Sequence, residues 1–230
     1  MRVSKTIHQT WISSDIATEL KYDWFKLNPT FKHNFADDNQ IDSFIKHSFD
    51  NDVYTCFKRL TCGAAKADFY RYCVLYKMGG VYIDIDIKPI CSLKSFIFDT
   101  ELTVVNDLYG LYNAFISCVQ HHPLMKACIH EICDSIENNK FNVGGYSVFD
   151  LCGPRMFMRV FSTFFNIRMN ENGTICESVN SHYKVLSHDL NNQTIQFNKT
   201  DLLKTQQQLP CQQNQFDTGN HYSHCDTLYT

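Results

Sequence analysis

The sequence lacks the features that mark nucleic-acid-binding and membrane-spanning proteins. It has 21 Lys and Arg against 24 Asp and Glu, a net charge of −3, and no basic stripe of the kind that nucleic acids require. It has no apolar run long enough to cross a bilayer, and residues 1–5 lack the apolar core of a signal peptide. We therefore expect no nucleic-acid partner, no transmembrane segment and a soluble, cytoplasmic chain, although a domain cut from an anchored protein would look the same.

Familiar cysteine and glycine motifs are also missing. The 11 cysteines include no Cys-x-x-Cys pair, so zinc-ribbon and thioredoxin-like interpretations lose their main support. Glycine-rich phosphate loops of the Walker or dinucleotide type are absent. We interpret the cysteines as reduced, mostly buried thiols.

The composition and the hydrophobic pattern predict a single α/β domain over residues 1–230. Hydrophobic residues make up 44% of the chain, enough to fill a sizeable core. Predicted strands alternate with predicted helices, which favours a mixed, mostly parallel sheet flanked by helices. The strands are expected at 5–12, 30–36, 81–87, 102–106, 114–119 and 183–186. The helices are expected at 15–28, 40–60 in two pieces, 62–78, 123–137, and 143–165 in two pieces, and residues 205–215 are expected to form a surface loop.

The most informative segment is the helix predicted over 62–78 and the strand that follows Gly79-Gly80. Alternation along a strand would place Val81, Ile83, Ile85 and Ile87 on one face. Tyr82, Asp84 and Asp86 would then share the other face, with the two carboxylates about 7 Å apart.

Two carboxylates on one strand face repel each other and are costly to bury, and a divalent cation is the simplest compensation. Carboxylate oxygens suit Mg²⁺ or Mn²⁺, and such an ion can bridge a diphosphate. An isolated Asp-x-Asp is weak evidence, because an edge strand facing solvent would show it as well.

The preceding helix strengthens the interpretation. Asp68 and Arg71 are three residues apart and so lie on one helix face. Arg71 offers a planar fork of donors to Asp68, to a sugar hydroxyl or to phosphate, and Asp68 can accept hydrogen bonds from sugar hydroxyls. A surface pair that contributes little is the alternative.

The pattern Ala-x-x-Ala-Asp-x-x-Arg followed by Gly-Gly-Val-Tyr-x-Asp-x-Asp resembles the DXD-containing family 32 glycosyltransferases, which include the yeast α-1,6-mannosyltransferases. The same pattern occurs in the catalytic domains of large clostridial glucosylating toxins. Further similar segments are residues 5–11, 113–116 with His122-Pro123, and Cys152-Gly153-Pro154, where the family usually has Thr-Gly-Pro.

The resemblance implies a GT-A-like fold and retaining transfer of a sugar from a UDP- or GDP-sugar to a glycan or other hydroxyl acceptor, with a metal that is usually Mn²⁺. It implies that Asp68 and Arg71 bind the donor sugar and that Tyr82 lines the nucleotide site. It also implies that Trp11 stacks on the base, that Asp84 contacts ribose or sugar and that Asp86 ligates the metal, with Asp84 beside it.

The C-terminal segment departs from the family pattern. Relatives often end with a His-containing segment followed by Ser-Trp, whereas this chain ends with Gly219-Asn220-His221-Tyr222-Ser223-His224 and no Trp follows. His221 is the candidate for the third metal ligand, although a terminal His is just as often a solvated side chain.

Two other classes stay open from the sequence. One is a phosphatase or phosphotransferase in which Asp84 is the nucleophile, although no downstream Ser/Thr and Lys motifs stand out. The other is a non-catalytic relative that binds nucleotide sugars or glycans, which the incomplete C-terminal motif permits.

Overall fold

The structure, a computed structural model, describes residues 2–12, 23–108, 110–141, 148–167, 178–179, 182–205 and 229–230. Its strands are β1 (Thr6–Thr10), β2 (Lys32–Ala36), β3 (Gly80–Ile83), β4 (Ile87–Pro89), β5 (Leu102–Asp107), β6 (Gly110–Leu111), β7 (Phe115–Cys118), β8 (Ser178–Val179), β9 (Tyr183–Asp189), β10 (Thr194–Phe197) and β11 (Thr200–Thr205). The helices are α2 (Asp38–Ser48), α3 (Asn51–Arg59), α4 (Gly63–Met78), α5 (Pro123–Glu137), α6 (Val148–Leu151) and α7 (Pro154–Phe165), with a 3₁₀ turn, η2, at Leu93–Ser95. Residues 23–27 are also helical, while 15–22 of the expected first helix and 206–215 of the expected loop lie outside the described residues.

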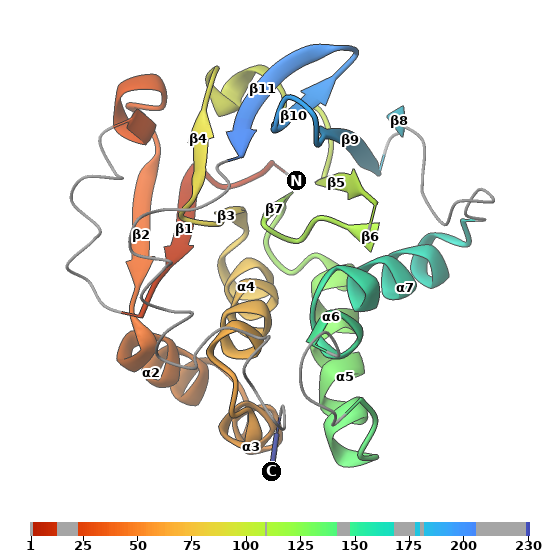
Figure 1. Cartoon of the computed structure of the whole chain (residues 1–230). Helices are drawn as coiled ribbons and strands as arrows, with labels where there is room; N and C mark the ends of the chain where they lie inside the picture. The colour runs from red at the N-terminus through yellow and green to blue at the C-terminus, as the bar shows by residue number, and fades with distance from the viewer. Residues whose placement is uncertain are drawn as a thin grey trace.

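The strands form one curled, mixed sheet in the order β2-β1-β3-β7-β5-β9-β10-β11-β4 (Figure 1). The expectation of a mixed sheet flanked by helices is confirmed, but the expectation that it is mostly parallel is wrong. Among the described residues, three strand pairs are parallel (β1–β2, β1–β3 and β5–β9) and seven are antiparallel. Two of the antiparallel pairs arise because short turns at 190–193 and 198–199 join β9 to β10 and β10 to β11, and such turns can join only antiparallel strands.

Five strands end at the same edge of the sheet. β2, β1 and β3 are mutually parallel, and β5 and β9 run in the same direction because each of the steps β3–β7 and β7–β5 is antiparallel. The carboxyl ends of β2, β1, β3, β5 and β9 therefore line one edge, which is where open α/β sheets bind their ligands.

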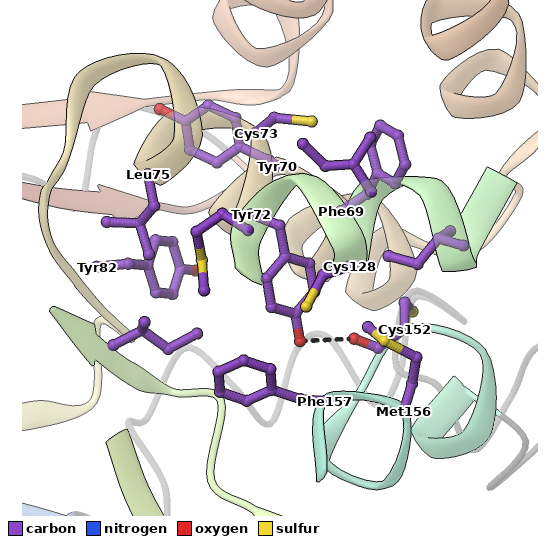
Figure 2. Packing of buried hydrophobic residues seen from close by; sticks show 14 of the residues in the cluster. Phe69, Tyr70, Tyr72, Cys73, Leu75, Tyr82, Cys128, Cys152, Met156 and Phe157 are labelled. Atoms are coloured by element: carbon purple, nitrogen blue, oxygen red, sulfur yellow. Dashed lines mark hydrogen bonds between the residues drawn. The ribbon is translucent and has the colours of Figure 1, made fainter. Parts of the chain in front are cut away.

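Strand alternation divides the core between the two faces of the sheet. Tyr82 belongs to a hydrophobic cluster shared with α4, α5 and α7, part of which Figure 2 shows, whereas its neighbours Val81 and Ile83 belong to a second cluster with Trp24 and Phe31. Figure 1 shows α4, α5, α6 and α7 grouped on one side of the sheet. Among the described residues, no helix is both long and apolar enough to span a membrane.

The strand expected over 81–87 ends at Ile83, so this expectation is wrong. The backbone N–H of Asp84 donates to the Ala114 carbonyl (2.8 Å), and that of Ile87 donates to the Asp84 carbonyl (3.1 Å). The chain thus turns at 84–87 and re-enters the sheet as β4, paired with β11. Asp84 and Asp86 are turn residues and do not share a strand face.

Gly79 and Gly80 connect α4 to β3 in backbone conformations that other residues rarely adopt, with φ of 61° and 101°. A Cβ at Gly80 would lie 2.6 Å from the Thr6 carbonyl oxygen, so β3 packs against β1 only because no side chain stands there. Nε2 of His8 lies 2.9 Å from the Gly79 carbonyl oxygen, and its Nδ1 lies 3.0 Å from Nδ2 of Asn34. This arrangement suits a neutral imidazole that donates from Nε2 and accepts at Nδ1.

We expect His8 to make the protein sensitive to acid. Burial lowers the pKa of His8 from 6.5 to about 4, against the opposing effect of the Gly79 carbonyl. Because the folded pKa lies below the unfolded one, the stabilisation is complete above pH 6.5 and is lost as the pH falls towards 4. The shift corresponds to roughly 3 kcal/mol.

The measurement is urea unfolding of the unchanged protein and of His8→Gln between pH 7 and pH 4.5. The unchanged protein should lose more unfolding free energy over this range than the variant does. His122, whose pKa burial also lowers to about 4, is unchanged in both and cancels in the comparison. Equal losses would contradict this role of His8.

Candidate functional site

A cavity of about 530 Å³ opens at the carboxyl edge of the sheet. It is lined by the ends of β1, β3, β5 and β9 together with residues of α2, α4 and α7. The sequence-predicted site residues that the structure describes all line this cavity: Trp11, Asp68, Arg71, Tyr82, Asp84 and Asp86. His221, with Ser223 and His224, lies outside the described residues.

Arg71 connects the helix to the turn that follows β3. One guanidinium nitrogen lies 2.8 Å from Oδ1 of Asp68 and 3.3 Å from Oδ1 of Asp84. The other terminal nitrogen donates to the Asn113 carbonyl at 2.7 Å, and the guanidinium carbon lies 4.6 Å from the centre of the Tyr82 ring. Arg71 is only 4% exposed, so its positive charge is placed between two carboxylates in a largely dry environment.

Asp68 is held from three sides. Besides Arg71, its Oδ1 accepts from Nδ2 of Asn113 at 3.0 Å, and its Oδ2 accepts from the Cys152 thiol at 3.5 Å. Tyr72 supports both partners, because it accepts from Asn113 at 3.3 Å and donates to the Cys152 carbonyl at 3.0 Å, the bond drawn in Figure 2. Burial raises the pKa of Asp68 to about 6, although Arg71 opposes the rise, so the carboxyl is largely ionised at neutral pH.

The turn at 84–87 brings both acidic side chains of the Asp-x-Asp motif to the cavity. The Asp84 side chain is one-third exposed and lies beside Arg71, while Asp86 is half-buried. Ile85 and Ile87 are buried and anchor the turn between them. The sequence reasoning placed the two acids in one site for the wrong local reason, since the turn and not strand alternation brings them together.

Tyr82 and Trp11 also line the cavity. Tyr82 is 1% exposed, so little of its side chain reaches the cavity. Trp11 is half-buried at the carboxyl end of β1, where its backbone N–H donates to the Ala36 carbonyl at 3.4 Å. It is therefore placed next to the end of β2 and the start of α2.

The sequence reasoning missed a second group of polar residues in the same cavity: Asp107, Tyr112, Asn113 and His188. Burial and the neighbouring carboxylates of Asp86, Asp84 and Asp107 hold the pKa of the Tyr112 hydroxyl well above its usual range, so the phenol stays protonated. Asn113 stood in a segment with a recognised resemblance, which was a usable signal. His188 and Asp107 stand alone at strand ends, and nothing in the sequence places them in the same cavity as Asp86.

The described residues contain no cluster of three or more His, Cys, Asp and Glu side chains that could hold a metal ion. Asp84 and Asp86 place two carboxylates in one cavity. Mg²⁺ and Mn²⁺ are commonly bound by one or two carboxylates of the protein, while substrate phosphates and water supply the other ligands. The residues present therefore fit such an ion.

Comparisons with known proteins match the segment that carries most of these residues. Residues 15–103 match the family model for the glycosyltransferase sugar-binding region containing a DXD motif. An uncharacterized glycosyltransferase, L373, of Acanthamoeba polyphaga mimivirus is 32% identical over 131 residues, which are 53% of this chain and 52% of that protein. The initiation-specific α-1,6-mannosyltransferase of Candida albicans is 34% identical over 107 residues, 43% of this chain and 28% of that protein.

Among solved structures, PaToxG glycosyltransferase matches 72% of this chain and 71% of its own with a TM-score of 0.60 at 18% identity, which shows a shared fold. The structural match shows that the chain has a GT-A-like fold. The family model matches residues 15–103, less than half of the chain, and Asp84-Ile85-Asp86 stands within that segment as a DXD motif. The chain spans about half the length of the mimivirus relative and less of the fungal one.

Proposed function

We propose that this protein is a retaining enzyme that transfers a sugar from a UDP- or GDP-sugar to a hydroxyl of a glycan or another acceptor, with Mn²⁺ or Mg²⁺ held by the DXD motif. The observation that carries the proposal is the bridge formed by Arg71 between Asp68 and Asp84, in the wall of a cavity that Asp86 shares. Such a buried cation between two carboxylates fixes the position of each group that would contact the donor.

The proposed donor pose uses side chains that line the cavity. Trp11, at the end of β1, stacks on the base, and Asp84 and Asp86, after β3, lie at the diphosphate. Asp68 and Arg71, on α4, contact the sugar, with Asp68 accepting from its hydroxyls. Tyr82 lines the nucleotide side and supports Arg71 through its ring face.

Asp86, together with Asp84, would hold the metal, and His221 is the proposed third ligand. When bound, the ion would neutralise charge that accumulates on the departing nucleoside diphosphate. The residues of the chain orient the donor and keep its anomeric carbon beside the acceptor hydroxyl. We assign no catalytic base, as a retaining transfer on one face of the sugar requires none from the protein.

The phosphatase alternative gains nothing from the geometry. Asp84 would have to be an unobstructed nucleophile, whereas its Oδ1 lies 3.3 Å from the Arg71 guanidinium. The third class is a relative that binds nucleotide sugars without turnover, and it is distinguished from an enzyme by measuring donor binding and donor hydrolysis separately.

The experiment combines thermal-shift measurements with a donor hydrolysis assay, using UDP-glucose and GDP-mannose with Mn²⁺, with Mg²⁺ and with EDTA. We expect one donor to raise the melting temperature only when metal is present, and to be hydrolysed slowly to its nucleoside diphosphate. Removal of the metal should abolish both responses. Stabilisation without hydrolysis or transfer would favour the binding protein, and no response to either donor would overturn the proposal.

A further inference from the structure

The polar residues at the ends of β5 and β9 form a second group in the cavity, apart from the Arg71 bridge. Along the shared sheet edge, Trp11 stands at the end of β1, the DXD turn follows β3, and Asp107 and His188 stand at the ends of β5 and β9. Asp107 and His188 are therefore separated from Trp11 by the DXD turn. If the base lies at Trp11 and the diphosphate at the turn, the far side of the cavity is left for the acceptor.

His188 is held in this group by a ring contact and a hydrogen bond. Its ring stacks on Tyr112 with centroids 4.8 Å apart and planes inclined by 29°. Its Nε2 lies 3.1 Å from Oγ1 of Thr205, the last residue of β11. The side chains of His188 and Asp107 are each 7% exposed, so both polar groups are withdrawn from bulk water while they line the cavity.

The other ring nitrogen of His188 lacks a hydrogen bond. Nδ1 is buried and has no hydrogen-bond partner in the part of the chain that the structure describes, and it lies 3.6 Å from Oδ1 of Asp107. The same Asp107 oxygen accepts from the Leu108 backbone N–H at 2.7 Å. A buried polar atom that the fold does not satisfy is costly, and it commonly marks a place that a ligand or water completes.

A hydroxyl group suits this pair because it can donate and accept at once. The hydroxyl can donate a hydrogen bond to Asp107 while it accepts one from Nδ1–H of His188. This tautomer of His188 is the one present when Thr205 donates to Nε2. With the opposite tautomer, Nδ1 becomes the acceptor, and a diol can serve both groups. An anionic ligand is disfavoured, because Asp107, Asp86 and Asp84 all lie around Tyr112.

We propose that Asp107 and His188 form the acceptor subsite, which binds a hydroxyl of a neutral sugar or other polyol beside the DXD turn. The inference rests on the proposed function, since it assigns the acceptor of the same reaction. His188 and Asp107 position the acceptor, and Tyr112 and Thr205 hold His188 in place.

The test separates acceptor use from donor use. His188→Ala, His188→Gln and Asp107→Asn would be assayed for donor hydrolysis and for transfer to a panel of methyl α-mannoside, methyl α-glucoside, methyl β-galactoside and myo-inositol. We expect kcat/KM for the acceptor to fall about tenfold to a hundredfold in the Ala and Asn variants, because each leaves a buried partner unpaired. Donor hydrolysis should stay within about twofold, since water needs no such positioning. The Gln variant, which keeps a side-chain donor, should retain part of the transfer.

His130→Ala, on the exposed face of α5, is the matched control and should change neither reaction. Transfer that survives unchanged in the variants would overturn the inference while leaving the proposed function intact, and so would equal loss of hydrolysis and transfer. Absence of donor hydrolysis and transfer in the unchanged protein would overturn the proposed function, and this inference with it.

Discussion

Asp86→Asn should lower the rate of donor turnover by about a thousandfold or more while leaving the fold intact. The substitution keeps the shape of the side chain and removes one of the two carboxylates of the DXD turn, both of which line the cavity. Asp86 is half-buried at a turn, so an amide in its place should cost little stability. The measurements are the release of nucleoside diphosphate from the donor and the melting temperature of the variant.

The control for this experiment is Asp134→Asn on α5. Asp134 is an exposed carboxylate paired with Lys140 and does not line the cavity, so turnover should not change. The metal dependence supplies a second comparison, because the stabilisation of the unchanged protein by donor with Mn²⁺ should disappear in Asp86→Asn. Turnover within a few-fold of the unchanged rate would contradict the assignment of Asp86 to the metal.

Several elements could be predicted from local chemistry. The helix expected over 62–78 is present as α4, and it ends at Gly79 because only glycine tolerates that conformation there. The helix expected over 123–137 has the same bounds as α5, because Pro123 is fixed at its first turn and His122 caps it by accepting from the Leu124 backbone N–H. Such starts and stops depend on neighbouring residues, so the sequence contains their cause.

Other parts of the fold depend on partners that are distant in sequence. The alternation of residues 81–87 suggests one continuous strand. However, the Asp84 N–H donates to the Ala114 carbonyl, and β4 pairs with β11. Neither partner can be predicted from the segment itself. The strand expected at 183–186 is present within β9, but the antiparallel strands β10 and β11 were missed, because the expectation of a mostly parallel sheet rested on strands that alternate with helices.

The candidate site also contains residues that could be predicted from a local segment and residues that depend on distant partners. Asp68, Arg71, Tyr82, Asp84 and Asp86 lie within one helix–turn–strand segment, so the spacing of the residues was enough to bring them to one cavity. The sequence also suggested that Arg71 could pair with Asp68, three residues away, and the structure adds Asp84 as a second partner. The pairing of His188 with Asp107 joins the ends of β9 and β5 and follows only from the strand order.

The second large effect concerns Arg71, for which charge alone should not be enough. Arg71→Lys keeps the positive charge, but an ammonium on a flexible stem cannot hold Asp68 and Asp84 from one nitrogen and the Asn113 carbonyl from another. We expect kcat for transfer and hydrolysis to fall about a hundredfold, because both carboxylates would lose their fixed positions relative to the donor.

Arg71→Met should be the more severe variant, because it leaves two carboxylates next to each other in a buried site without their cation. Removing one partner of a buried ion pair costs about 3–5 kcal/mol, so this variant should unfold at much lower urea concentration at pH 7. Burial holds the pKa of Asp68 at about 6 even with Arg71 present, so loss of the cation should raise it further and part of the lost stability should return as the pH falls to about 5. Arg155→Lys is the matched control. Arg155 forms an ion pair with Asp150 at 3.0 Å between half-exposed side chains, so this change should alter stability by less than about 1 kcal/mol.

If Arg71→Lys turned over donor at the rate of the unchanged protein, the bridge between Asp68 and Asp84 would be a structural ion pair only, and donor positioning would have to be assigned to other residues of the cavity.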